Sequence, residues 1–293
     1  MKDISHRIRF ALGVAAGVIL VGCGSGIAPI SNPSGIPTLL ESGRSNARAE
    51  YKLYVVSLFS NGETFTPKGK QTHPRFNSKL ASGVAVDKHG KIYVTIEAPN
   101  GDGFLITFLP NGARTTPTID NLYRPVGVAV DANGKIYIAS DHTVSTYTPG
   151  GKPAKPTIAG SARGVAVDKN GKIYVASNDI RTYTPQGKPT KPTIADGGPD
   201  VAVDKNGKIY VAGGLSNSVR TYTPNGKRTT PTITAGLNNP ISVAIDPNGK
   251  IFVVSFGTYL SGPWSVTSYK PNGEQTTPTI TNGLTDPVSV AIR

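Results

Sequence analysis

Sulfur, aromatic and acidic side chains are scarce in this sequence of 293 residues. It has one cysteine, one methionine, one tryptophan and four histidines. A single cysteine excludes an internal disulfide, and no cysteine–histidine spacing of a zinc site is present. No glycine-rich phosphate loop and no serine nucleophile elbow occurs either. Acidic residues number 18 against 31 lysines and arginines, so the formal net charge is +13.

The repeat region also lacks the 3.6-residue apolar period of helices, and it carries one unit six times instead. The clearest copy is Gly164–Ala176, a small apolar run, a tight turn and the triplet Ile-Tyr-Val. The aspartate that closes the apolar run recurs at Asp87, Asp131, Asp168, Asp204 and Asp246, which are 44, 37, 36 and 42 residues apart. Periods near 40 with β-rich sequence predict the blades of a β-propeller.

One copy is predicted to contain four short strands, at residues 201–203, 209–212, 219–223 and 230–233. Asp and Gly between the first two strands are typical of a tight turn, in which Asp bonds nearby backbone amides. A proline recurs in the fourth strand of every copy. Since proline cannot donate to a ladder, this strand is predicted to be the outer edge of the blade and the first strand the inner one.

The two ends of the repeat region complete one blade. The first copy begins with the second-strand residues 53–56, and the last residues, 289–292, are a first strand with nothing after it. The sequence therefore predicts an all-β fold over residues 51–293. We expect a six-bladed β-propeller with four antiparallel strands per blade, closed by pairing of the C-terminal strand with the N-terminal blade.

The unit "GVAVD-x-x-GKIYVA", with Asn178–Tyr183 and Asn217–Tyr222 in two copies, resembles the NHL-repeat family of six-bladed propellers over residues 51–293. Propellers related to that family include binding modules, lactonases and streptogramin lyases. The resemblance implies the fold and leaves these functions open. A lactonase of this type would need Glu, Asn and Asp on a divalent ion, and a streptogramin lyase would need a catalytic histidine with a metal-binding partner.

Residues 1–22 have the features of a lipoprotein signal peptide. Lys2, Arg7 and Arg9 precede an apolar run from Phe10 to Gly22, which is too short for an ordinary spanning helix. The run ends at Cys23 in Leu-Val-Gly-Cys, which resembles a bacterial lipobox and predicts lipidation of Cys23. Residues 23–50, rich in Gly, Ser, Pro and Asn, predict a flexible tether. We therefore expect a lipid-anchored protein of the bacterial cell envelope that faces the periplasm or the cell exterior.

A four-stranded meander places its connections on two faces. The tight turns between first and second strands and between third and fourth strands form the tight-turn face, which carries most of the lysines. The longer connections form the loop face, where the copies differ, and differences are expected at a binding face. The candidate binding residues there are Glu97, Asp102, Asp141, His142, Asn178, Asp179, Asn217, Tyr259 and Trp264. Connections on this face also hold Tyr123, Arg124, Arg163, Asn238, Asn239 and Asp286.

We expect a non-enzymatic binding or scaffold module for an envelope protein or glycan, without a cofactor and without nucleic acid as a partner. The alternative is a lactonase, hydrolase or lyase that uses Ca²⁺ or Mg²⁺, with oxygen ligands such as Glu97, Asp141 and Asp179 at the channel mouth. The repeated aspartates are expected to serve the turns rather than catalysis, because Asp at the first turn position bonds the backbone.

Overall fold

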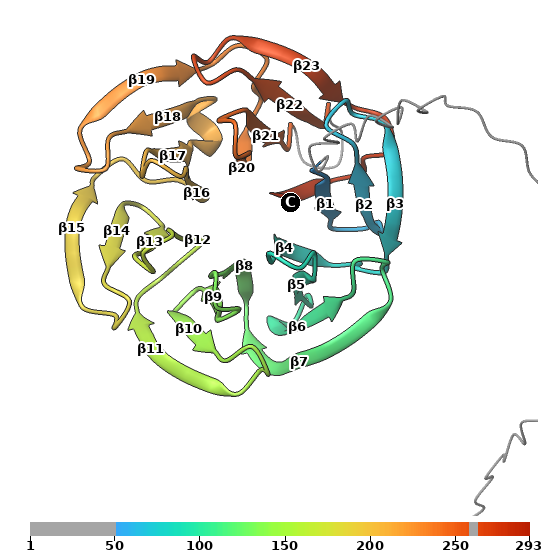
Figure 1. Ribbon diagram of the computed structural model, residues 1–293, viewed down its shortest axis with the longest axis vertical. Coiled ribbons are helices and arrows are strands. Elements are labelled where there is room, and N and C mark those ends of the chain that lie inside the picture. Colours follow the sequence, from blue (N-terminus) through green and yellow to red (C-terminus); the bar gives the residue numbers. More distant parts are fainter. Residues whose placement is uncertain (1–50, 258–262) are drawn as a thin grey trace, which may run out of the picture. The chain divides into compact units, whose positions relative to one another are not determined.

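Each repeat forms one antiparallel sheet of four strands, and six such sheets surround a central channel in the computed structural model (Figure 1). The structure describes residues 51–257 and 263–293. The inner strands are β24 (Pro287–Ile292), β4 (Ala81–Val86), β8 (Pro125–Val130), β12 (Gly164–Val167), β16 (Asp200–Val203) and β20 (Pro240–Ile245). The second strands are β1 (Leu53–Ser57), β5 (Ile92–Glu97), β9 (Ile136–Ser140), β13 (Ile173–Ala176), β17 (Ile209–Ala212) and β21 (Ile251–Ser255).

The remaining strands form the outer half of each blade. The third strands are β2 (Gly62–Phe65), β6 (Asp102–Phe108), β10 (Thr143–Tyr147), β14 (Ile180–Tyr183), β18 (Val219–Tyr222) and β22 (Ser265–Tyr269). The outer strands are β3 (Gln71–Phe76), β7 (Arg114–Tyr123), β11 (Pro153–Ala159), β15 (Pro189–Ile194), β19 (Arg228–Ile233) and β23 (Gln275–Ile280). A short 3₁₀ helix, η1 (Gly214–Ser216), lies between β17 and β18. Within the described part of the chain, no helix is long and apolar enough to cross a membrane.

The predicted ring closure is confirmed. The first blade has the strand order β24-β1-β2-β3, so the last strand of the chain pairs with the first, and Tyr54 lies opposite Ala291. Lys52 and Arg293 exchange two backbone hydrogen bonds beside this pair. Closure of the ring removes the unpaired inner edges that an open row of blades would leave at its two ends.

The hydrophobic core consists of layers between neighbouring blades. The second strands are buried along their whole length, as in β9, except at Glu97, the half-buried last residue of β5. Tyr174 of one blade packs with Val201 and Ile209 of the next. Because each layer is shared by two blades, no blade buries its faces alone.

The repeated aspartates are turn residues, as the sequence predicts. Asp168 Oδ1 accepts hydrogen bonds from the backbone N–H groups of Asn170 (2.8 Å) and Lys172 (3.0 Å). Its Oδ2 accepts one from the Tyr174 hydroxyl at 3.3 Å. The same three bonds recur at Asp87, Asp131 and Asp204. These carboxylates are therefore engaged by their own blades.

The repeated prolines lie on the outer strands, as predicted. Each follows a cis peptide bond, for example Thr116-Pro117 in β7. The Pro117 carbonyl accepts a hydrogen bond from the Thr107 hydroxyl of β6 at 2.9 Å. Proline has no backbone N–H to donate, and its place on the outer strand leaves no ladder bond unmade. Its carbonyl receives a hydrogen bond from a side chain of the third strand.

Candidate functional site

The connections lie on two faces, and the cavities of each face are lined by one kind of connection. A cavity of about 520 Å³ lies between the tight turns around Asp168 and Asp204. One of about 410 Å³ lies between the longer connections around Asn178, Pro199 and Gly214. The tight-turn face and the loop face predicted from the sequence are therefore separate surfaces with different walls.

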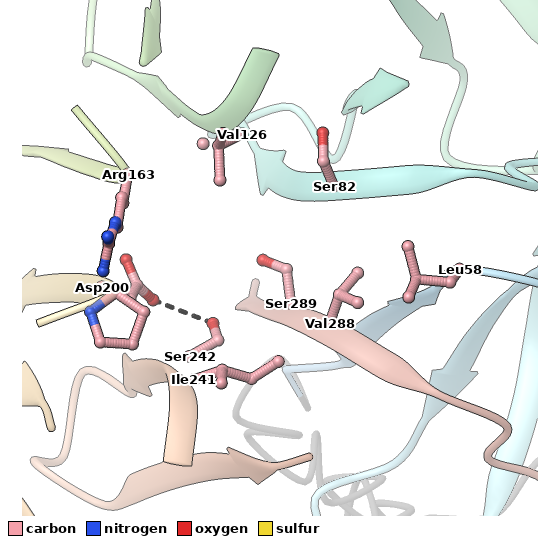
Figure 2. A pocket seen from close by; sticks show the side chains of 11 residues that line it. Leu58, Ser82, Val126, Arg163, Asp200, Ile241, Ser242, Val288 and Ser289 are labelled. Atoms are coloured by element: carbon pink, nitrogen blue, oxygen red, sulfur yellow. Dashed lines mark hydrogen bonds between the residues drawn. The ribbon is translucent and has the colours of Figure 1, made fainter. Parts of the chain in front are cut away.

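The channel opens on the loop face as a cavity of about 260 Å³, which we call the channel-mouth cavity (Figure 2). Its wall is built where the inner strands begin, by Ser82, Val126, Pro199, Ile241 and Val288, with Leu58 beside them. All six blades contribute, and most of these side chains are aliphatic. Arg163 and Asp200, from neighbouring blades, supply its charges.

The channel-mouth cavity continues into the 410 Å³ cavity, because both are lined by Arg163, Pro199 and Ile241. We call this outer part the loop-face groove. Backbone of Gly197, Gly198, Gly213 and Gly214 lines it, together with Asn178 and Asn239. Leu215 of η1 also lines the groove, and with 91% of its surface accessible it is the most exposed large apolar residue of the described chain.

Glycine lines the groove because the connections there pack too closely for side chains. A Cβ at Gly197 would lie 2.3 Å from the Ser177 carbonyl oxygen, and a Cβ at Gly198 would lie 1.9 Å from the Ala212 carbonyl oxygen. Both distances are below any contact that a real Cβ makes. The groove is therefore walled by backbone.

Asp200 is the buried acid of the site. Its Oδ2 accepts hydrogen bonds from the Ser242 hydroxyl (2.9 Å) and the Val243 N–H (3.0 Å), and its Oδ1 accepts one from the Val201 N–H (2.8 Å). Protein surrounds the carboxylate, while the residue keeps some accessible surface because it borders the channel. Burial raises the pKa of this carboxyl to about 6, although the three hydrogen bonds oppose the rise.

The structure brings Glu97 and Asp141 together on one cation. Arg124 Nε lies 3.2 Å from Glu97 Oε1, and Arg124 Nη1 lies 2.7 Å from Asp141 Oδ2. This ion-paired group links the connections of the second and third blades. Neither carboxylate lines the channel-mouth cavity, whose wall is formed by other residues.

Four further predicted residues are engaged on the loop face, Asp179 and Asp102 within their own loops and His142 and Asn217 with a neighbouring segment. Asp179 pairs with Arg181 at 3.0 Å, and Asp102 accepts a hydrogen bond from the Asn100 amide at 2.6 Å. His142 stacks on Tyr123 with ring centroids 5.5 Å apart. Asn217 has a positive φ of 48° and accepts a hydrogen bond from the Asn239 N–H at 2.6 Å. These contacts assign the four side chains roles in holding the loops.

The last predicted residues have different outcomes. Asn178 lines the loop-face groove. Trp264 is half-buried before β22, and its buried Nε1 has no hydrogen-bond partner among the described residues. Tyr259 and Cys23 lie outside the described residues. Among residues 51–257 and 263–293, no group of three or more His, Cys, Asp or Glu side chains could hold a metal ion.

Sequence reasoning named Arg163 only as a loop-face residue and did not select Asp200. A signal for Asp200 exists in the repeats themselves. The residue before the Val-Ala-Val or related triplet is Gly83, Gly127, Gly164, Asp200, Ser242 and Ser289 in the six blades. Asp200 is the charged residue in this series, and the position faces the channel mouth.

The lysines of the tight-turn face divide into two groups. Lys172 Nζ donates to the Lys191 carbonyl at 2.6 Å and lies 5.4 Å from the centroid of the Tyr174 ring. The same two contacts recur at Lys91, Lys208 and Lys250, the last over a phenylalanine ring. Lys88, Lys169 and Lys205 instead are exposed. Structural lysines thus account for part of the basic charge, and exposed ones for the rest.

Comparison with known proteins identifies the fold and no family. No family model matches the chain, and no curated protein matches it. Among solved structures, 873 chains match, so the fold is widespread and does not by itself indicate a function. One is the crystal structure of a protein of unknown function from Bacteroides caccae. It has a TM-score of 0.64 and 13% sequence identity, and the match covers 83% of this chain and 99% of that one.

Proposed function

We propose that the protein is a binding module that receives a partner on the loop face of its propeller. Its exposed apolar side chains carry this proposal. Of the four large apolar residues that are exposed in the described chain, three belong to the loop face: Phe59 and Leu215 lie on its connections, and Tyr123 ends β7 there. Leu109 lies on a tight turn. Leu215 lines the loop-face groove, and exposed apolar residues on one face are typical of interaction surfaces.

We propose a protein rather than a glycan as this partner. The side-chain amides of Asn178 and Asn239 offer donors and acceptors that suit a peptide chain, and Leu215 offers an apolar contact. The signal-like residues 1–22 and the lipobox-like Cys23 support a lipid-anchored protein of the cell envelope, which would present this face to envelope partners.

Photo-crosslinking in the cells that make the protein tests the proposal. A photoreactive amino acid is placed at Leu215, and in a matched control at Leu109 on the opposite face, which is 41% exposed. We expect a discrete adduct from position 215 whose added mass is unchanged by glycosidase, and none from position 109. An adduct whose added mass is removed by glycosidase would replace the protein partner by a glycan. Equal adducts from both positions would contradict a loop-face site.

The metal-dependent enzyme remains the alternative for the same end of the channel. Its predicted ligands Glu97, Asp141 and Asp179 each have an arginine partner. A divalent ion would have to displace those arginines, and for this reason we favour the binding module.

A further inference from the structure

The channel mouth has one polar side and one bare side. Where the inner strands begin, three successive blades carry Gly83, Gly127 and Gly164, and the next three carry Asp200, Ser242 and Ser289. On the polar side these side chains bond from blade to blade: the Ser242 hydroxyl donates to Asp200, and the Val290 N–H donates to Ser242 Oγ at 3.3 Å. Asp200 is the first member of this series.

The Asp200 carboxylate lies at the border between the two sides. A Cβ on Gly164 would lie 2.7 Å from Asp200 Oδ1, so the bare side admits this oxygen only because residue 164 is glycine. Its bonds all come from uncharged donors. A buried carboxylate without a cation is costly, and a cation that enters the channel would relieve that cost.

Arg163 is the cationic side chain of the same cavity, and it has no acidic partner among the described residues. Five other arginines of the described chain hold acidic side chains, namely Arg75, Arg124, Arg181, Arg220 and Arg228, whereas Arg114 and Arg293 lie outside this cavity and form no ion pair. The Arg163 guanidinium makes no ion pair or hydrogen bond with the described residues, and it is exposed at the junction of the cavity and the groove. Figure 2 shows Arg163 and Asp200 on the same side of the cavity, on neighbouring blades.

The rest of the cavity wall is mainly aliphatic. Leu58, Val126, Ile241 and Val288 line it together with the hydroxyl side chains of Ser82 and Ser289. The volume of about 260 Å³ is below the usual range of drug-sized pockets, roughly 300–1,000 Å³. Such a space suits a small molecule with one apolar group and two opposite charges close together.

We propose that the channel-mouth cavity binds a small zwitterion of the α-amino-acid class, with its carboxylate on Arg163, its ammonium group on Asp200 and an aliphatic side chain against Ile241 and Val288. Each charge of the ligand then meets the opposite charge of the protein, and the complex of ligand and site is neutral. Charge-assisted hydrogen bonds are stronger than hydrogen bonds between neutral groups. This inference goes beyond the proposed function, because the ligand enters the channel rather than the groove.

Calorimetric titration of the full-length protein with three related probes at pH 7.5 tests the proposal. L-Leucine carries both charges, N-acetyl-L-leucine keeps the carboxylate, and L-leucinamide keeps the ammonium group. We expect leucine to bind and each of the other two to bind at least about tenfold more weakly. No binding of leucine at millimolar concentration, or equal binding of the three probes, would overturn the proposal.

Variants taken from the protein's own repeats assign the two contacts. Arg163→Val introduces the residue that stands at the same place in the third blade, Val126, and Asp200→Ser introduces the residue of the sixth blade, Ser242. We expect each to weaken leucine binding about tenfold or more. Arg114→Val, at an exposed residue on the outer strand β7, is the matched control and leaves leucine binding unchanged.

A fallback for a misfolded variant and a control in the groove complete the leucine-binding experiment. If Asp200→Ser fails to fold, Arg163→Val and the probe series still decide, because the Arg163 side chain makes no bond that folding needs. Leu215→Ser changes the groove and not the cavity, so it should leave leucine binding intact. Unchanged affinity in Arg163→Val would overturn the proposal while the crosslinking result at position 215 stands.

Discussion

At the scale of single residues, one position in each inner strand determines the chemistry of the channel mouth. Glycine there lets the backbones of neighbouring blades approach, since a Cβ on Gly127 would lie 2.9 Å from the Arg163 carbonyl oxygen. Serine there adds a hydroxyl that bonds the next blade, as Ser289 does with the Val84 N–H at 3.3 Å. Only aspartate adds a charge, so Asp200 makes the stability of the ring depend on pH.

Replacing Asp200 by serine should remove that dependence. The pKa of this carboxyl is about 6 in the folded protein against an ordinary value of 3.8, because burial disfavours the charged form. The folded state therefore holds this proton more tightly than the unfolded state, and the contribution of Asp200 to stability falls as the pH rises from about 4 to about 6. Arg163 is the other charged group of the cavity wall.

Urea unfolding of wild type and Asp200→Ser at pH 4 and pH 7 measures the effect. We expect the difference in unfolding free energy between the two proteins to move by roughly 1–3 kcal/mol in favour of the variant at pH 7. Ser289→Gly, which changes an uncharged member of the same series, should follow the wild-type pH profile. If the unfolding free energies of wild type and Asp200→Ser changed in parallel with pH, burial would not raise the pKa of this carboxyl.

At the scale of the elements, the turns between third and outer strands join neighbouring blades. Gly151 has a φ of 82°, and a Cβ there would lie 2.5 Å from Cβ of Pro117, which belongs to the outer strand of the preceding blade. Gly226 meets Pro192 in the same way at 2.4 Å. The repeated Gly and Pro thus form a contact that recurs around the rim. Both residue types are constrained by this contact between blades as well as by the local turn.

Gly151→Ala should therefore destabilise the protein, whereas Gly150→Ala should not. The first change places a Cβ in a left-handed conformation and against a proline ring, which costs at least about 1 kcal/mol. A Cβ on Gly150 meets its nearest atom only at 3.9 Å. Chemical denaturation of the two variants gives the comparison, and equal effects would mean that the rim contact contributes nothing to stability.

The same contrast explains what could be predicted from the sequence. Tight turns repeat their chemistry, so Asp168, Gly171 and Pro192 have counterparts around the ring and indicate strands, turns and outer edges directly. The channel mouth was not predictable in this way, because it forms where six distant segments meet. Attention to the variable loops selected Glu97 and Asp141, which are ion-paired to Arg124. Asp200 stands where the other five blades have glycine or serine, and this single difference lies inside a strand rather than in a variable loop.

At the scale of the whole molecule, the exposed tight-turn lysines and the proposed binding site lie on opposite faces of the propeller. The tight-turn face carries exposed lysines such as Lys88, Lys169 and Lys205, and the loop face carries the groove and the channel mouth. Removing residues 1–22, with three basic residues and one acidic residue, lowers the formal charge from +13 to +11. A protein with this charge is attracted to anionic surfaces whether or not it carries lipid.

Membrane attachment must therefore be tested where charge no longer contributes. At about 1 M salt the screening length falls to about 3 Å, which removes most attraction between exposed lysines and an anionic surface, whereas acyl chains keep about 0.8 kcal/mol for each buried methylene. We expect the wild type to sediment with membranes in 1 M salt and Cys23→Ala to stay in the supernatant. In low salt both sediment in part, because the basic face is the same in both. Sedimentation of Cys23→Ala at 1 M salt equal to the wild type would contradict the lipid anchor.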